Sequence, residues 1–162
     1  MKVILRKAIA SDSKALLALI KELAVFEKEP DSVHITEEDI RTYGFESPSK
    51  FNCFVAEVNG VVVGMALYYP RFSTWKGPTL HLEDLIVSEA YKGKGIGTQL
   101  YTAFIQEAYS LGVARIEWNV LDWNAPAISF YVKSGADVLH EWSTVQMHRA
   151  EMKVFLDKQQ RE

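Results

Sequence analysis

The sequence of 162 residues contains one cysteine, Cys53, and no long apolar run. A single cysteine forms no internal disulfide and provides no paired-cysteine metal site. No apolar stretch is long enough to cross a bilayer. Because Arg6 and Lys7 interrupt the short apolar run near the start, we expect no signal peptide. These absences predict a cytoplasmic protein that does not bind a membrane.

The chain also has no excess of positive charge. Its 18 Lys and Arg residues are set against 21 Asp and Glu, which gives a formal net charge of −3. That balance argues against a nucleic-acid-binding surface and is compatible with small cationic substrates. With 48% hydrophobic residues, the composition is that of a globular protein, and the length fits one domain spanning residues 1–162. No metal site is expected, because metal-ligand spacing is lacking among His34, His81, His140 and His148.

Hydrophobic periodicity predicts helices and strands in mixed order. Asn59-Gly60 is a strong hairpin signal, and Thr36 with Asp39 resembles a capping box. The last dozen residues are polar and are expected to be helical or frayed. Helices are expected from Ser11–Ser13 to about Phe26 or Glu27, from Thr36 towards Tyr43, and over 96–111 and 124–133, and strands over 3–7, 51–58, 61–69, 80–87 and 115–121 and near Val138 and Val145. This order predicts a mixed α/β fold.

The most informative segment is the glycine loop, Tyr91-Lys92-Gly93-Lys94-Gly95-Ile96-Gly97, between an expected strand and an expected helix. Its glycines let backbone N–H groups face an anion at the start of the helix. A Walker loop needs Lys followed by Ser or Thr after the last glycine. A dinucleotide fingerprint needs two residues between its second and third glycines. Both spacings fail, so we expect a phosphate-binding loop of another kind, with a plain strand-to-helix turn as the alternative.

Three segments together resemble the GNAT superfamily of acetyl-CoA-dependent N-acetyltransferases. They are Leu82-Glu83-Asp84-Leu85-Ile86-Val87, the glycine loop, and Asp122-Trp123-Asn124-Ala125-Pro126-Ala127 with Phe130-Tyr131. Within the superfamily the chain most resembles the diamine (spermidine/spermine) and thialysine branch, through Ile20-Lys21-Glu22-Leu23-Ala24, Phe26-Glu27-Lys28 and Val120-Leu121-Asp122-Trp123-Asn124. The resemblance implies a central, mostly antiparallel mixed sheet flanked by helices. It also implies a homodimer.

The same resemblance implies where acetyl-CoA binds. The strand backbone would pair with the pantetheine arm, the loop would hold the pyrophosphate, and the segment that opens the later helix would contact the cosubstrate further along. These residues are Leu85, Ile86 and Val87; Lys92, Gly93, Lys94, Gly95, Ile96, Gly97 and Thr98; and Asn124, Pro126, Ala127 and Tyr131. Lys92 stands where the family usually has Arg or Gln. Because backbone N–H groups supply most of the binding, we expect altered geometry there and retained function.

Acetyl transfer to an amine requires two proton movements, and the resemblance implies a residue for each. Glu83 would accept the proton of the amine, and it would also contact the substrate. A carboxylate is a poor base for an alkylammonium, so this role requires a site with little water. Tyr131 would donate a proton or a hydrogen bond to the departing thiolate. Asp84 is expected on the opposite face of the strand from Glu83 unless a bulge intervenes.

The amine substrate is expected to contact Phe26 and Glu27, with Glu117, Trp118 and Asn119 as weaker candidates. Cys53 is expected to pack in the core, since no histidine base is placed near it by a motif. His81 lies two residues before Glu83 and hence on its face of the strand. It replaces an aromatic residue of the family branch. We hypothesise that His81 alters the basicity of Glu83.

We therefore predict an N-acetyltransferase that moves acetyl from acetyl-CoA to a primary amine of a small cationic substrate by direct attack. The substrate is a polyamine or a lysine-like amine such as thialysine, and Phe26-Glu27-Lys28 favours the latter. The alternatives are a protein N-terminal or aminoglycoside-type acetyltransferase, or a CoA-binding module without turnover. After Gly135 the chain departs from the family branch, because His140-Glu141-Trp142-Ser143 replaces a longer acidic segment.

Overall fold

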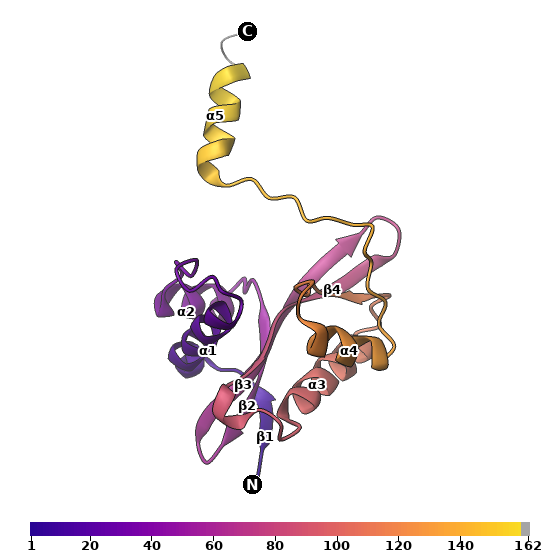
Figure 1. Ribbon diagram of the computed structural model, residues 1–162. Helices are drawn as coiled ribbons and strands as arrows, with labels where there is room; N and C mark the ends of the chain where they lie inside the picture. Colours follow the sequence, from indigo (N-terminus) through magenta and orange to yellow (C-terminus); the bar gives the residue numbers. More distant parts are fainter. Residues whose placement is uncertain (160–162) are drawn as a thin grey trace. The chain divides into compact units, whose positions relative to one another are not determined.

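The computed structural model describes residues 1–159, which fall into two compact units, Met1–Leu121 and a second unit that begins at Asp122. The first unit is built on a five-stranded sheet with the order β1-β2-β3-β4-β5 (Figure 1). Pairing is antiparallel from β1 to β4 and parallel between β4 and β5, which confirms the predicted mixed sheet. The strands are Ile4–Lys7, Asn52–Val58, Val61–Ser73, Gly77–Val87 and Ile116–Glu117 for β1 to β5.

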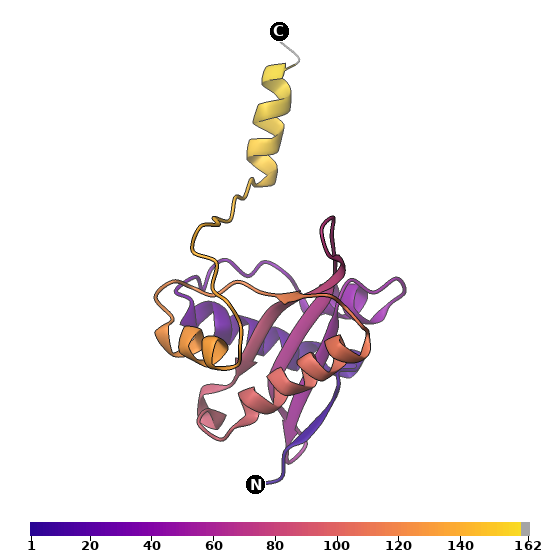
Figure 2. The same cartoon turned by 90° about the vertical axis from the view of Figure 1, so that its right-hand side faces the viewer.

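Helices cover both faces of this sheet. The helices α1 (Ser13–Phe26) and α2 (Glu37–Phe45) lie on one face and α3 (Ile96–Ser110) on the other, as Figure 1 shows. In the view of Figure 2, α3 crosses in front of the strands. The sequence predicted each of these helices to within a few residues. No helix of residues 1–159 is both long enough and apolar enough to span a bilayer.

Strand alternation divides the core into two layers. Cys53, Val55, Met65 and Leu67 pack against α1 and α2, and this cluster includes the fully buried Leu16. Residues of the opposite parity face α3, where the ring of Phe54 stacks on Tyr68 at 5.9 Å and Tyr68 contacts Phe104 at 5.2 Å. Cys53 thus belongs to the core, as expected, and burial raises the pKa of its thiol.

The local signals for turns and caps are confirmed. Asn59 and Gly60 both adopt positive φ, at 50° and 79°, in the turn between β2 and β3. The hydroxyl of Thr36 accepts from the amide of Asp39 at 3.1 Å, and the Asp39 carboxylate accepts from the amide of Thr36 at 2.8 Å. Before α1, the guanidinium of Arg6 donates to both carboxylate oxygens of the buried Asp12 at 2.7 and 3.0 Å. This ion pair fixes the connection from β1 to α1.

Three expected strands differ from the structure. The strand predicted over 115–121 is reduced to Ile116–Glu117, because it finds ladder partners on β4 only at Leu80 and His81. The prediction of two late strands near Val138 and Val145 is wrong, because no strand forms in residues 136–148. Apolar alternation does not make a strand unless a neighbour supplies hydrogen bonds, and none of the described strands pairs with this segment.

Over residues 122–159, the second unit contains two helices, α4 (Ala125–Lys133) and α5 (Arg149–Gln159). The predicted helix over 124–133 is confirmed, with Asn124 as its N-cap: the side-chain oxygen accepts from the amide of Ala127 at 3.4 Å. The helix α5 accounts for most of the polar end, for which helix was one of the two expectations.

Candidate functional site

The glycine loop forms the junction between β4 and α3. A short 3-10 turn, Glu89–Tyr91, precedes it, and α3 begins at Ile96. Gly93 and Gly95 have φ of 73° and 75°, a conformation that side-chain-bearing residues rarely adopt. Gly95 is the N-cap of α3, so the free N–H groups of the first helical turn begin at the end of the loop. Such an end of a helix attracts anions.

The two lysines of the loop are held by their neighbours. Lys92 pairs with Glu89 at 2.6 Å, and its ammonium lies 5.1 Å from the ring centre of Phe26. Lys94 donates to the carbonyl of Ala90 at 3.1 Å. The contact between Lys92 and Phe26 joins the loop to the end of α1, and the carboxylate of Glu22 on α1 accepts from the amide of Glu89 at 2.7 Å. The predicted phosphate loop and the predicted substrate residues at the end of α1 are therefore neighbours.

A β-bulge lies at Glu83. Leu67 of β3 is paired with Asp84, and the next residue, Tyr68, is paired with Leu82, so Glu83 is the extra residue of β4. A bulge disturbs strict alternation and re-aims the side chains beside it. The sequence predicted that Glu83 and Asp84 point to opposite faces unless a bulge intervenes, and such a bulge is present.

Glu83 is half exposed and is held from one side by the facing strand. The Tyr69 hydroxyl donates to its Oε2 atom at 2.6 Å, and His81 Nε2 lies 3.6 Å from the same oxygen. The rings of Tyr69 and His81 stack with centres 5.2 Å apart. The prediction that His81 and Glu83 share a face is confirmed by this geometry.

Asp84 and Glu27 complete an acidic group with Glu83. Burial raises the pKa of Asp84 to about 7, and the negative charges of Glu83 and Glu27 act in the same direction. Burial likewise raises the pKa of Glu27, which follows the last residue of α1. Asp84 therefore lies close enough to the other two carboxylates to be affected by their charges, and such a concentration of negative charge favours a bound cation.

Beyond its first residues, β4 lacks a strand neighbour on the side of β5. The described ladder between these strands contains only Leu80 with Ile116 and His81 with Glu117. On the other side, Leu85, Ile86 and Val87 are all paired with β3. One edge of the strand over 82–87 therefore has no strand partner within residues 1–159. This is the edge that the sequence prediction assigned to the pantetheine arm.

The predicted residues that follow Leu121 belong to the second unit. Pro126 and Ala127 lie in the first turn of α4 after the cap Asn124, and Tyr131 lies in its last turn beside Phe130, with ring centres 5.5 Å apart. Their roles stay predictions.

Of the weaker substrate candidates, Glu117 forms ion pairs with Arg71 and Arg115, and Trp118 packs edge-on against Tyr101 at 5.7 Å.

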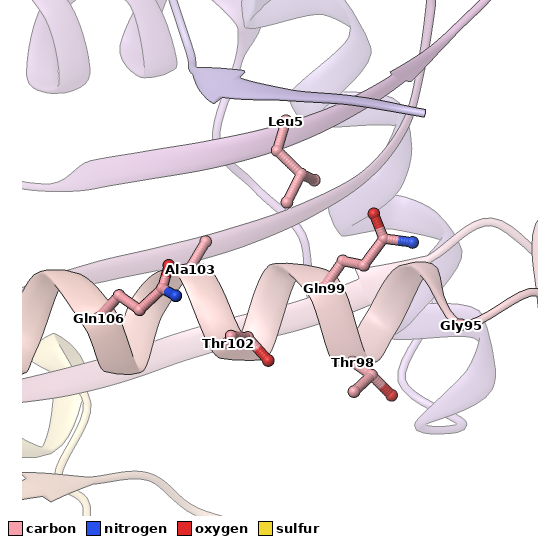
Figure 3. A pocket seen from close by; sticks show the side chains of 7 residues that line it. All are labelled: Leu5, Gly95, Thr98, Gln99, Thr102, Ala103 and Gln106. Atoms are coloured by element: carbon pink, nitrogen blue, oxygen red, sulfur yellow. The ribbon is translucent and has the colours of Figure 1, made fainter. Parts of the chain in front are cut away.

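A separate cavity of about 420 Å³ lies along the outer side of α3 (Figure 3). Leu5 of β1 borders it, and from α3 and its cap come Gly95, Thr98, Gln99, Thr102, Ala103 and Gln106. It contains no charged side chain and none of the acidic residues described above. Within the described chain, no group of three or more His, Cys, Asp or Glu residues is arranged to hold a metal ion.

Sequence reasoning missed Tyr69 and placed Asp84 apart from Glu83. Tyr69 lies at the end of the expected strand 61–69, and its register with β4 follows from the hairpin between Ser73 and Gly77. A register drawn from that hairpin would have set Tyr69 opposite His81. The bulge itself has no signature in the sequence, because neither Gly nor Pro marks it.

Comparison with known proteins gives a consistent result. The profile of the Acetyltransferase (GNAT) family matches residues 16–136. A thialysine N-epsilon-acetyltransferase of Bos taurus is 39% identical over 147 residues, 86% of this chain and 86% of that protein. A spermidine/spermine N(1)-acetyltransferase-like protein 1 of Homo sapiens is 35% identical over 158 residues, 91% of this chain and 23% of that protein. An integron cassette protein from the mobile metagenome of V. cholerae has a similar fold, with a TM-score of 0.78, 24% identity, and coverage of 96% of this chain and 98% of that one.

Proposed function

Because the chain belongs to the GNAT family of acetyltransferases, we propose that it transfers acetyl from acetyl-CoA to the distal primary amine of a small, lysine-like cationic substrate such as thialysine. It is an acetyltransferase, and the family uses acetyl-CoA as cosubstrate. The nature of the amine is the part of the proposal that depends on the site. A polyamine is the second candidate, favoured by the similarity to the spermidine/spermine-like protein.

The observation that carries this proposal is the acidic group of Glu27, Glu83 and Asp84. Burial, together with the negative charges of Glu83 and Glu27, raises the pKa of Asp84 to about 7, and a bound ammonium would relieve the repulsion between these charges. A protein N-terminus brings a single positive charge on an extended chain, so a groove with few carboxylates suits that substrate. Three neighbouring carboxylates instead favour a compact substrate with an ammonium group.

Glu83 is proposed as the proton acceptor and Tyr131 as the donor. An alkylammonium with a pKa near 10.4 is neutral in only about one molecule in 2,500 at pH 7, a cost of roughly 4–5 kcal/mol. Glu83 would receive this proton, directly or through water. The amine nitrogen would then form a C–N bond with the thioester carbonyl carbon, the C–S bond would break, and the second proton lost by the nitrogen would pass through water to the departing thiolate of CoA. Tyr131 would stabilise that thiolate with its O–H group.

The cosubstrate is proposed to bind along one edge of β4 and at the glycine loop. The unpaired edge over 82–87 supports hydrogen bonding of the pantetheine amides to Leu85, Ile86 and Val87. The loop from Lys92 to Thr98 would hold the pyrophosphate through backbone N–H groups. The predicted contacts of Asn124, Pro126 and Ala127 would lie further along the molecule of CoA.

An amine panel tests the function. The protein would be mixed with acetyl-CoA and thialysine, lysine, spermidine, an aminoglycoside or an N-terminal peptide, and release of free CoA thiol would be followed. We expect the highest kcat/KM for thialysine or lysine. A higher value for spermidine would transfer the assignment to polyamines. Tight acetyl-CoA binding without thiol release for any amine would overturn the proposal.

A pair of glycine variants tests the loop. Gly95→Val places a side chain at φ 75° in the loop, whereas Gly77→Val imposes similar strain at φ 82° in the first residue of β4, and neither added Cβ meets an atom within 4 Å. We expect Gly95→Val to weaken acetyl-CoA binding at least about tenfold in calorimetry, because the backbone can no longer hold its position near the phosphates. Gly77→Val should lose stability alone. Equal acetyl-CoA affinities of the two variants would show that the loop is only a turn.

Single-domain organisation, a cytoplasmic location and a homodimer are the remaining parts of the proposal. Exposed apolar side chains in the second unit support self-association: Trp142 is 70% and Val145 91% exposed, and Phe155 and Leu156 of α5 exceed half. Light scattering of the purified protein would give a mass near twice 18.4 kDa if the dimer forms. A monomer at micromolar concentration would contradict it.

A further inference from the structure

The Oε2 atom of Glu83 is approached by two side chains. The Tyr69 hydroxyl donates to it at 2.6 Å, and His81 Nε2 is 3.6 Å away. Tyr69 and His81 are directly opposite each other in the β3–β4 ladder, and their stacked rings hold both groups in place. The ring of His81 is almost buried, with 10% of its side chain exposed. Two sheet-anchored groups therefore face one oxygen of Glu83.

The other side of the imidazole is occupied by a charged pair. An Arg71 N–H group lies 3.5 Å from His81 Nδ1, and the Glu117 carboxylate lies 4.0 Å from the same nitrogen. Arg71 also pairs with Glu117. A guanidinium carries only donors, so it favours the tautomer in which Nδ1 accepts and Nε2 carries the proton. That proton is then directed at Glu83.

We propose that Tyr69 and His81 are positioning residues for Glu83: they hold its Oε2 atom and leave Oε1 for the substrate ammonium, and a proton gained by His81 weakens amine binding. This inference rests on the proposed function. It concerns residues that the resemblance does not assign, and His81 replaces an aromatic residue of the family branch. In the proposed step, the N–H bond of the ammonium breaks, and an O–H bond forms at Oε1 of Glu83. Tyr69 and His81 keep their protons.

The charges around His81 set the direction of the pH effect. Burial lowers the pKa of His81 and Arg71 acts in the same direction, while Glu83 opposes them. His81 is therefore neutral at neutral pH. As the pH falls, it gains a proton at Nδ1, beside Glu117, and becomes a cation next to Glu83. That cation competes with the substrate ammonium for the same carboxylate. Burial raises the pKa of Tyr69 to about 12, so its hydroxyl remains a donor throughout.

The first experiment compares kcat and KM for the amine from pH 5.5 to 8.5 in the wild type, His81→Gln and Tyr69→Phe. Gln retains an N–H donor but does not titrate. We expect KM of His81→Gln to match the wild type at pH 8 and to be roughly two- to fivefold lower at pH 5.5. Repeating the comparison in the Asp84→Asn background removes the titration of Asp84 from both profiles. Identical acid limbs in wild type and His81→Gln would overturn the role of His81.

Tyr69→Phe keeps the stacked ring and removes only the O–H group. Its kcat/KM should fall roughly fivefold at every pH if the hydroxyl orients Glu83. An unchanged kcat/KM would remove Tyr69 from the proposal. A purely structural role for Tyr69 would lower thermal stability and leave kcat/KM of the folded enzyme unchanged.

A second experiment separates this inference from the proposed function, because it needs no turnover. The ring resonances of His81 would be titrated by NMR with and without lysine. Bound ammonium at Glu83 should shift the titration of His81 to lower pH, by the reciprocity of linked equilibria. Glu83→Gln should shift it the same way without lysine and abolish the effect of lysine. Glu46→Gln, at the residue that follows α2, is the matched control: it should neither shift the titration of His81 nor change the effect of lysine. If lysine shifts His81 but no amine is acetylated, the proposed function fails and this inference stands. If amines are acetylated but His81 responds to neither lysine nor Glu83→Gln, the inference fails alone.

Discussion

Two consecutive tyrosines on β3 make the same contact in two different settings. Tyr68 is buried and donates to Glu107 of α3 at 3.2 Å, and Tyr69 donates to Glu83 of β4 at 2.6 Å. Glu107 is also bound by Lys7 at 2.7 Å. Among the described residues, Glu83 has no lysine or arginine within ion-pair distance, and the basic side chain beside it is His81, which is neutral at neutral pH.

The difference shows how one motif serves structure on one face of the sheet and is suited to chemistry on the other. In the cluster of Lys7, Tyr68 and Glu107, the Lys7 ammonium already neutralises the charge of the Glu107 carboxylate. Lys7 also lies 3.9 Å from the ring centre of Phe54. At Glu83 the negative charge is uncompensated and is joined by Asp84 and Glu27. A carboxylate without a protein cation is the one that can accept a substrate cation.

Exchanging the two glutamates for glutamine should give the largest contrast. We expect Glu83→Gln to lower kcat/KM for the amine about 100-fold or more, which is typical of losing a general base. Glu107→Gln, the matched control, should change kcat/KM less than about twofold. Steady-state kinetics with saturating acetyl-CoA would measure both. Similar losses in the two variants would show that Glu83 has no special role.

Asp84 should make stability depend on pH. Its folded-state pKa of about 7 lies above the ordinary value of 3.8. The unfolded chain therefore releases this proton at a lower pH than the folded protein does. The contribution of Asp84 to the free energy of unfolding is fully present below about pH 3.8 and is lost as the pH rises through 7. We expect the free energy of unfolding to fall by roughly 3 kcal/mol from pH 5 to pH 8 through this group. Urea unfolding of wild type and Asp84→Asn at both pH values would measure it; the variant should lack this part of the decrease. An equal decrease in Asp84→Asn would contradict the assignment.

Removing the hydroxyl of Tyr68 or of Tyr69 should have the smallest effect on stability. The two variants should nevertheless separate a structural role from a role at the site. Tyr68→Phe leaves Lys7 and Glu107 without their shared hydroxyl, and it should cost about 1 kcal/mol of unfolding free energy with unchanged kcat/KM. Tyr69→Phe should change the unfolding free energy by less than about 0.5 kcal/mol, because its hydroxyl bonds a half-exposed carboxylate. Thermal unfolding of the two variants side by side would test this. A larger loss of unfolding free energy in Tyr69→Phe than in Tyr68→Phe would contradict the structural role assigned to Tyr68.

The sequence predicted features that depend on a few adjacent residues. Asn59-Gly60 specified its hairpin through positive φ, and Thr36 with Asp39 specified the start of α2. The glycine loop was placed correctly at the junction of β4 and α3, because its glycines are the residues that tolerate that backbone. These are local interactions, and local chemistry determines them.

Features that depend on distant partners were not predicted. The strand expected over 115–121 is short because only two residues of β4 pair with it. No strand forms near Val138 and Val145, because none of the described strands pairs with that segment. The bulge at Glu83 is likewise a property of the β3–β4 pair, so the relation of Asp84 to Glu83 could not be read from one strand. The contact of Tyr69 with Glu83 joins residues 14 positions apart and required the register of the hairpin.

The unpaired edge of β4 over residues 82–87 bears on how the protein behaves when its cosubstrate is scarce. A row of unpaired backbone groups is a template on which strands of other molecules assemble. If the amides of pantetheine bind there as proposed, the cosubstrate also acts as a removable edge strand that shields the sheet from aggregation. The supply of acetyl-CoA would then influence how long the enzyme survives in the cell as well as how fast it works.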